Sequence, residues 1–203
     1  MLSGQVRPEE IPSAESDADL IELSLREPAR FGVIYDRHAA EILRYAHARL
    51  GPSSAEEVMA ETFLAAFRRR DKYDCSRSDA RPWLYGIATR QISKHRRTEG
   101  RHQRALARLH AEAASEDFAD RSDDRVTAQG LRPRIATVLA GMSQRDRDLL
   151  LLIAWAGLSY DETARALGIP IGTVRSRLNH IRTHTREALG GANPARATEG
   201  HQP

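Results

Sequence analysis

The segment LSYDETARALGIPIGTVRSRLNHIRTHTREAL, residues 158–189, decides the fold class of the C-terminal part of the chain. Near its start, Ser159 is followed three residues later by glutamate, a capping-box pattern that predicts a short helix. Gly168 can adopt the positive φ that ends this helix, and Pro170 cannot continue it. A second helix follows, and we place Thr173 at its N-cap. Two helices joined by so short a turn form a helix-turn-helix unit.

The second helix of this unit has an apolar face and a polar face. Val174, Leu178 and Ile181 lie on one side at about 100° per residue, and we expect them to be buried. The residues predicted to contact DNA are Thr173, Arg175, Ser176, Asn179, Thr183 and Arg186. In the major groove Arg can pair bidentately with guanine, and Asn with adenine. The pattern predicts DNA binding, because a helical hairpin buried in a core would not leave such side chains facing outward.

Two histidines on the same helix, His180 and His184, have the i, i+4 spacing that can ligate zinc. The residue after the first is Ile181, where a zinc metalloprotease motif has glutamate. We therefore expect a solvated or phosphate-facing pair, and we predict no metal site and no cofactor.

Upstream of this unit, apolar residues keep helical spacing almost throughout, and no convincing strand pattern occurs. Two further capping-box patterns begin at Ser53 and Ser143, and Pro82 is placed for a first helical turn. The predicted helices span residues 17–27, 31–50, 54–70, 82–109, 131–140, 144–156, 159–167 and 173–189. The predicted fold class is therefore all-α.

Segments poor in apolar residues divide the chain. Residues 110–130 are small, polar and acidic, which predicts a flexible linker because they cannot bury a face. The ends of the chain, 1–16 and 190–203, lack periodicity and are predicted to be disordered. Two small helical domains remain, over 17–109 and 131–189.

The composition indicates a folded, soluble protein. Of 203 residues, 40% are hydrophobic and 29% are charged. The single Cys75 excludes an internal disulfide and a cysteine-based zinc site, so a reducing, cytoplasmic compartment is expected. No apolar run approaches the ~20 residues that span a bilayer, and no export signal is visible at the N-terminus.

The charges are distributed unevenly, although the formal net charge is only +3. Basic residues concentrate over 94–108 and 175–186, and acidic residues over 112–124 separate them. Two electropositive surfaces suit a polyanion held at two places, since clustered Lys and Arg release counterions from a phosphate backbone. Two solvated helix faces would give the same pattern, so charge alone leaves both interpretations open.

Three segments together resemble the extracytoplasmic-function (ECF) sigma factors, the small two-domain members of the bacterial sigma-70 superfamily. They are SSAEEVMAETFLAAFRRRDKYD (53–74), ARPWLYGIATRQISKHRR (80–97) and MSQRDRDLLLLIAWAGLSYDETARALGIPIGTVRSRLNHIR (142–182). The resemblance implies a sigma-two-like domain and a sigma-four-like domain that bind RNA polymerase core and promoter DNA without enzyme activity. In regulated members an anti-sigma factor is a further partner.

The resemblance also implies roles for residues of the first domain. In the family, acids at the positions of Glu57 and Glu61 dock on the coiled coil of the polymerase beta-prime subunit. The helix from Pro82 matches the element that captures the −10 region, and the loop 71–81 matches the specificity loop that holds one flipped base. The residues expected to contact the −10 strand are Tyr73, Thr89, Arg90, Ser93, Arg96 and Arg97.

The remaining segments have counterparts in the family as well. The family's linker runs near the nucleic-acid channel of the polymerase, which the acidic segment 110–130 suits. The helix pair over 131–156 resembles the part that grips the beta-subunit flap, while the helix-turn-helix reads the −35 element. Trp83 is expected in the core, because it stands beside Leu84 at a helix start.

The chain departs from the family at Arg90, where the motif WLYGIATRQ usually has asparagine. Asn offers a donor and an acceptor to a base edge, whereas Arg offers only donors and a permanent charge. Either Arg90 reads a different −10 base, or it contacts the backbone and selectivity moves to the loop 71–81. We favour the backbone contact, since Arg96 and Arg97 continue the same basic stripe.

Two other functions would leave different signals in the sequence. A helix-turn-helix activator of the response-regulator type carries a βα receiver or ligand domain upstream, whereas the upstream half here is helical. An enzyme would show a nucleophile elbow, a Gly-rich phosphate loop or a paired-carboxylate site, and none appears. An enzyme or a helical adaptor without a DNA role would be favoured if the protein failed to stimulate promoter-specific transcription by core polymerase and showed catalytic turnover.

Overall fold

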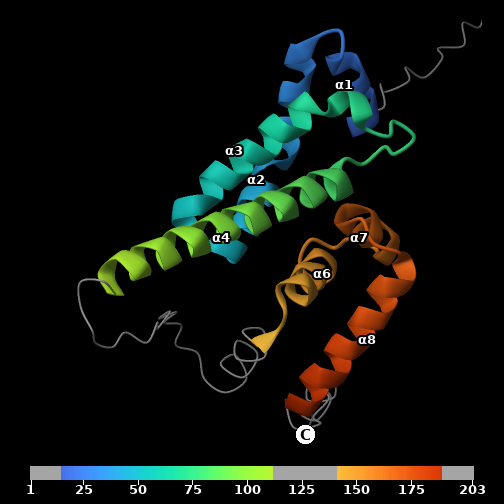
Figure 1. The fold of residues 1–203 in the computed structure, drawn as a ribbon. Coiled ribbons are helices and arrows are strands. Elements are labelled where there is room, and N and C mark those ends of the chain that lie inside the picture. The colour runs from blue at the N-terminus through green and yellow to red at the C-terminus, as the bar shows by residue number, and fades with distance from the viewer. Residues whose placement is uncertain (1–14, 112–140, 189–203) are drawn as a thin grey trace, which may run out of the picture.

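The computed structural model describes residues 15–111 and 141–188 of the chain. Within these two ranges every regular element is a helix (Figure 1), which confirms the all-α fold class. The N-terminal part contains α1 (Asp17–Ser24), η1 (Pro28–Arg30), α2 (Phe31–Leu50), α3 (Pro52–Arg68), η2 (Arg70–Lys72) and α4 (Arg81–Ala111), where η denotes a 3-10 helix. The C-terminal part contains α6 (Gln144–Ala154), α7 (Tyr160–Leu167) and α8 (Ile171–Ala188).

The predicted helix starts are confirmed in two cases and wrong in a third. Ser159 caps α7 in a full capping box, and Ser143 caps α6 through a hydrogen bond that its side chain accepts. The predicted cap at Ser53 is wrong, because α3 already begins at Pro52, whose fixed φ suits a first helical turn. A capping box that the prediction missed begins α1 at Ser16.

The N-terminal helices enclose one hydrophobic cluster. Helices α2 and α3 form a hairpin around Gly51, whose φ of 80° lies in the region that favours glycine, and α4 packs against both (Figure 1). Among the fully buried side chains of this cluster are Leu20, Ile21, Ile34, Ile42, Tyr45, Val58, Leu84 and Ile92. This core fixes the orientation of α3 and α4.

A smaller cluster holds the helix-turn-helix unit together. Its buried residues are Leu149, Ala164, Val174, Leu178 and Ile181. Ala164 of α7 is buried in this cluster together with Val174, Leu178 and Ile181 of α8.

The two parts of the chain pack against each other. Leu152, Ala156, Leu158 and Ala166 come from the C-terminal part but are buried in the N-terminal cluster. Helix α7 lies against α4, while α8 extends away from it (Figure 1). The prediction of two separate helical domains did not foresee this shared core.

Several predicted features lie outside the described residues. They are most of the N-terminal extension 1–16, the helix 131–140, the tail 190–203 and the linker 110–130 beyond its first two residues. Those two residues continue α4, which ends at Ala111.

Candidate polymerase and nucleic-acid interfaces

Helix α8 presents the face that its apolar spacing predicted. Val174, Leu178 and Ile181 are buried against the other helices of the unit. The polar side chains on the opposite face are exposed, and they are Arg175, Ser176, Asn179, Thr183 and Arg186. This arrangement allows the helix to enter the major groove of DNA with its polar face toward the bases.

The start of α8 lies two residues earlier than predicted. The helix begins at Ile171, and the backbone N–H groups of Thr173 and Val174 donate to the carbonyl of Pro170. Thr173 is therefore the third residue of the helix and not its cap. The turn before it is as predicted, since Gly168 ends α7 in the left-handed region with φ 66°.

Helix α3 carries the predicted acidic stripe. Glu57 is exposed, and a carboxylate oxygen of the partly exposed Glu61 lies 3.8 Å from Nζ of Lys94. Leu64 continues this stripe and is 48% exposed, although the opposite side of the helix is buried in the core. The sequence analysis missed Leu64, whose signal was a leucine three residues after Glu61 on the polar side. The stripe therefore combines two carboxylates with an open apolar side chain.

Thr89 of α4 does not face outward, contrary to the prediction. It is 6% exposed. Its hydroxyl donates to the carbonyl of Tyr85 at 2.8 Å and lies 2.9 Å from the hydroxyl of Tyr45. Because the single hydroxyl proton of Thr89 is donated to Tyr85, Thr89 accepts from the Tyr45 hydroxyl, whose pKa burial raises to about 12. The prediction assumed one buried face, but α4 packs against α2 and α3 and also against α7.

The arginines of α4 have different surroundings. Arg90 and Arg97 are exposed, as predicted. Arg96 is half-buried, and its guanidinium donates to the side chain of Gln144 in α6 and to the backbone carbonyl of Arg49. Burial lowers the pKa of Arg96. These two hydrogen bonds engage the Arg96 guanidinium within the protein, so it is not free to bind phosphate.

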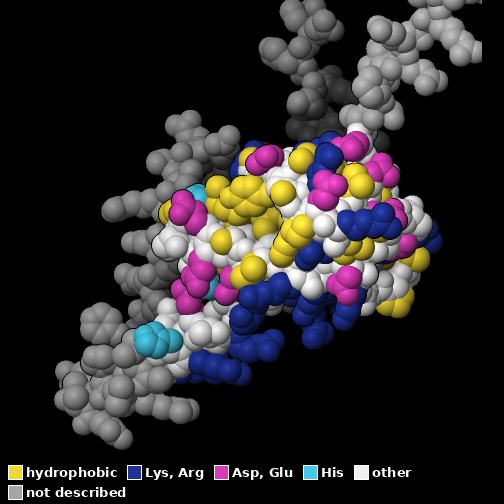
Figure 2. Space-filling view, turned by 90° about the horizontal axis from the view of Figure 1, so that it is seen from above, with side chains coloured by type: hydrophobic (Ala, Val, Ile, Leu, Met, Phe, Trp, Pro, Cys, Tyr) yellow, Lys and Arg dark blue, Asp and Glu magenta, His cyan; other side chains and the backbone are white. Residues whose placement is uncertain are grey.

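Ser93, also on α4, lies in a groove between this helix and α7. It is partly buried rather than fully outward, because Ala166 and Leu167 of α7 form the other wall of the groove. Figure 2 shows many Lys and Arg side chains along the lower edge of the molecule, and the rest of that face carries hydrophobic and acidic side chains with further basic ones among them.

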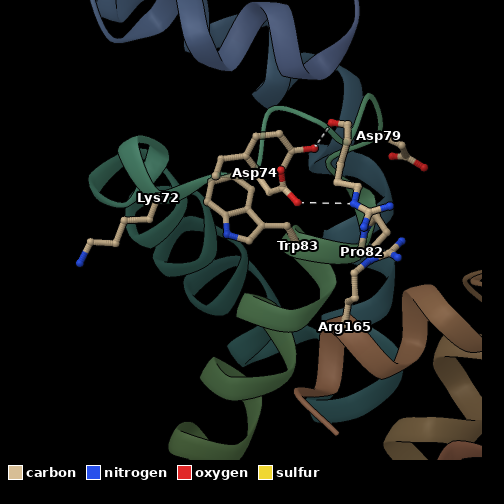
Figure 3. Close-up of a pocket in the computed structure, with 8 residues that line it drawn as sticks. Lys72, Asp74, Asp79, Pro82, Trp83 and Arg165 are labelled. Carbon is tan, nitrogen blue, oxygen red and sulfur yellow. Dashed lines mark hydrogen bonds and ion pairs between the residues drawn. The ribbon is translucent and has the colours of Figure 1, made fainter. Parts of the chain in front are cut away.

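A cavity of about 190 Å³ lies beside the loop that precedes α4 (Figure 3). Tyr73 and Trp83 line it, with ring centroids 5.0 Å apart, and the Tyr73 hydroxyl donates to the carbonyl of Arg77 at 2.6 Å. Arg165 reaches the cavity from α7. Trp83 packs against the core as expected and also forms part of the cavity wall. Aromatic rings beside cations are groups on which an unpaired base and its phosphate can bind.

Asp17, the first residue of α1, anchors this loop. Its carboxylate accepts hydrogen bonds from the Ala80 backbone N–H and from Arg37, each at 3.0 Å, and Nε2 of His38 lies 2.8 Å away. Its own N–H donates to the Ser78 carbonyl. Burial acts to raise the pKa of Asp17, but hydrogen bonds from His38, Ala80 and Arg37 outweigh it and lower the pKa to about 2. No sequence motif marked this ionised anchor.

Polar contacts join the two parts of the chain. Arg49, at the end of α2, donates to the carboxylate of Asp148 in α6, and both side chains are buried. Arg81 donates to the carbonyl of Ala156 at 2.6 Å, and its Nε donates to Glu41 at 3.1 Å. These contacts lie around the shared hydrophobic core.

The remaining candidate sites offer little chemistry. Among the described residues, no group of three or more metal-binding side chains occurs, and His180 and His184 are exposed with ring centroids 6.4 Å apart. Burial and nearby carboxylates raise the pKa of the exposed Cys75 thiol, which disfavours the reactive thiolate. In the described part of the chain, none of the helices combines the length and the apolar character that crossing a membrane requires.

Family models match both parts of the chain. Sigma-70 region 2 matches residues 34–102, and sigma-70 region 4 matches residues 132–184. The probable RNA polymerase sigma-C factor of Mycobacterium bovis is 35% identical over 131 residues, which are 64% of this chain and 66% of that protein. The ECF RNA polymerase sigma factor SigL of Mycobacterium tuberculosis is 32% identical over 155 residues, which are 76% of this chain and 85% of that protein.

Two solved structures share the fold. The structure of CnrH in complex with the cytosolic domain of CnrY has a TM-score of 0.59 and 23% identity, and the match covers 87% of this chain and 99% of that chain. The structure of the sigma factor RpoE in complex with the anti-sigma factor NepR, from Bartonella quintana, has a TM-score of 0.56 and 20% identity, and the match covers 79% and 97% of the two chains.

Proposed function

This chain belongs to the ECF RNA polymerase sigma factors, and we propose that it binds the core polymerase and directs initiation at a set of promoters. The observation that carries the proposal is the exposed polar face of α8 in a chain that also contains sigma-70 region 2. A response-regulator activator is not favoured, because region 2 stands where that class has its receiver domain. The protein acts with the polymerase in the cytoplasm.

Helix α8 is assigned to the −35 element. Arg175 and Asn179 are exposed in the first half of the helix, the part with which the recognition helix of such a unit contacts base edges. Arg186, at the far end, is assigned to a phosphate. Thr173 is partly buried, so it supports the helix start more than it contacts DNA.

Helix α4 and the loop before it are assigned to the −10 region. Arg90 and Arg97 are exposed donors for the strand backbone, and the cavity beside Tyr73 is assigned to one flipped base. Thr89 is assigned a structural role, because its buried hydroxyl bonds to the Tyr45 hydroxyl of α2 and to the Tyr85 carbonyl of α4. Unstacking a base costs roughly a few kcal/mol, and binding of the unstacked bases supplies this free energy. Opening the duplex therefore needs no chemical reaction, and no catalytic residue is proposed.

The stripe of Glu57, Glu61 and Leu64 is assigned to the core polymerase. Two carboxylates can pair with basic side chains of a partner, and the open leucine adds apolar contact area at their side. The coiled coil of the beta-prime subunit is the partner that this stripe fits, and the beta-subunit flap is assigned to the C-terminal domain. An anti-sigma factor is proposed as a further partner, because structures of related folds were obtained as such complexes.

Transcription with purified core polymerase from the same organism tests the function. We expect promoter-specific transcripts only when this protein is added, with a steep decrease as salt rises. Equal initiation at the organism's promoters with and without the protein would reject the proposal.

The polymerase contact is tested by charge reversal. Glu57→Lys with Glu61→Lys should weaken core binding while leaving the unfolding midpoint nearly unchanged, because exposed helix charges contribute little to stability. Glu56→Lys is the matched control, since Glu56 is also exposed on α3 but lies off the stripe. Core binding by the double variant at the level of this control would remove the stripe from the interface.

A further inference from the structure

We propose that the surface of α4 around Gly86 is a docking site for helix α7 of the same chain, and that the −10 DNA strand competes with α7 for this surface. The docking is inferred from packing alone, whereas the competition rests on the proposed function of α4. The free protein is then closed, and it opens when the DNA-binding surfaces are used.

Gly86 permits the closest approach between the two helices. A Cβ atom built at this position would lie 2.5 Å from the carbonyl oxygen of Ala166 and 3.2 Å from its Cα. Real Cβ atoms do not come this close to backbone, so only glycine allows α7 to lie where it does. Glycine is unfavourable in the middle of a helix relative to alanine. At Gly86, unlike at Gly100 of the same helix, the close contact with the backbone of α7 accounts for the glycine.

Apolar burial supports the same contact. Leu152, Leu158 and Ala166 are each at most 3% exposed, and all three are buried in the cluster of the N-terminal helices. Leu167 packs against both hydrophobic clusters. These side chains would become exposed to water if the C-terminal part moved away, so burial of their apolar surface favours the closed form.

In the closed form, α7 covers the face of α4 that is assigned to the −10 strand. Ala166 and Leu167 form a wall of the groove that contains Ser93, and Arg96 donates to the C-terminal part instead of to a phosphate. Arg165 stands at the cavity assigned to the flipped base. A strand laid along α4 and into this cavity would occupy space that α7 now fills, so the two cannot bind together.

The polar contacts make the closed form reversible. The buried Arg49 has two guanidinium nitrogens, Nε and Nη1, without a hydrogen-bond partner, although a third nitrogen pairs with Asp148. Burying an ion pair with unmet donors costs desolvation energy that the pairing only partly returns. Opening returns these groups to water, so α7 can be displaced by a ligand that binds α4.

Substitution at Gly86 tests the docking without removing any side chain that contacts DNA. Gly86→Ala should open the full-length protein and raise its radius of gyration in solution scattering. Gly100→Ala is the matched control, because Gly100 also lies in α4 and its Cβ would meet only the flexible side chain of Arg104, at 3.5 Å. An unchanged radius of gyration in Gly86→Ala would overturn the docking.

A charge swap tests the docking independently, should Gly86→Ala disturb folding. Asp148→Arg should place two cations together and open the protein. Combining it with Arg49→Glu should restore the pair and close the protein again. An unchanged radius of gyration in Asp148→Arg would overturn the docking, and an opening that the double change does not reverse would remove this ion pair from the closed form.

Competition is measured with a fluorescent single-stranded −10 oligonucleotide taken from a promoter that the wild-type holoenzyme uses. If the open form is a minor state, about 0.1–10% of molecules, Gly86→Ala should bind this strand about tenfold or more tightly than Gly100→Ala. Equal affinity in an opened variant would reject competition and keep docking. Failure of the wild-type protein to direct transcription would instead reject the proposed function, and the scattering result would stand without it.

Discussion

Helices α4 and α8 are the two candidate DNA-reading elements, and they differ in what surrounds them. Helix α8 is buried along one side by α6 and α7, and its predicted polar face is exposed from Arg175 to Arg186. Helix α4 packs against the hairpin of α2 and α3 and also against α7. Its predicted polar face is therefore divided into the exposed Arg90 and Arg97, the partly buried Ser93 and Arg96, and the buried Thr89. Helical periodicity predicts a polar face reliably when a helix has neighbours on only one side.

The largest expected effect concerns α8. Replacing Arg175 by Ala should cost about 1–3 kcal/mol of promoter binding and relax selectivity at one −35 position, because a bidentate base contact is lost. Arg186→Ala should weaken binding to all promoters alike. Selection from randomised promoters by each variant holoenzyme measures both effects, and an unchanged −35 preference in Arg175→Ala would mean that α8 lies in the groove in another orientation.

The next prediction concerns the pH dependence of stability that comes from Asp17, the anchor of the loop before α4. The pKa of Asp17 is about 2 in the folded protein against 3.8 for a free side chain. The unfolded state therefore binds the proton more tightly, so the stabilisation is complete above about pH 4 and is lost as the pH falls toward 2. The loss should be about 2 kcal/mol of unfolding free energy.

Hydrogen exchange and urea unfolding at several pH values check this prediction. Exchange protection, measured relative to the intrinsic exchange rate at each pH, should fall in the loop before α4 before it falls in α8 as the solution is acidified, since Asp17 holds Ser78 and Ala80 of that loop. Asp17→Asn should lose most of the stabilisation at neutral pH and flatten the acid dependence. A wild-type acid dependence in this variant would assign the effect to other carboxylates.

Thr89 should behave as a core residue, unlike the polar residues of α8. Thr89→Val keeps the shape but removes the hydroxyl that pairs with Tyr45 and Tyr85, at an expected cost of about 1 kcal/mol in unfolding free energy. The −10 sequence preference should not change. A new base preference with unchanged stability would return Thr89 to the DNA-contacting face.

The smallest effect concerns Arg90, the exposed counterpart of Thr89 on α4. Arg90→Asn should lower affinity at all promoters and reduce the salt slope by ~0.7, the value for one phosphate contact on a single strand. Binding titrations at several salt concentrations measure this slope. A switch in the preferred base at one −10 position would instead show that Arg90 reads a base.

The sequence determined the all-α class, and most helix ends lie within a few residues of their predicted positions, because caps and periodicity are local signals. Contacts between distant segments were not predictable in this way. The burial of Thr89 depends on which helix arrives at α4, and the anchoring role of Asp17 depends on partners 20 to 63 residues away. The close contact at Gly86 was not predictable either, because Gly32 and Gly100 also lie inside helices and have no backbone of another element close to them.

Trp155 is the C-cap residue of α6, and its indole stacks on the ring of Tyr45 in α2 with centroids 6.2 Å apart, while 45% of the residue remains exposed. Indole emission responds to neighbouring groups and to water, so this stack gives the chain an intrinsic optical signal. The chain has two tryptophans, and Trp83→Phe would leave Trp155 as the single emitter. Rapid-mixing fluorescence could then follow in real time, without an attached dye, how fast the C-terminal helices leave α2 when polymerase or DNA is added.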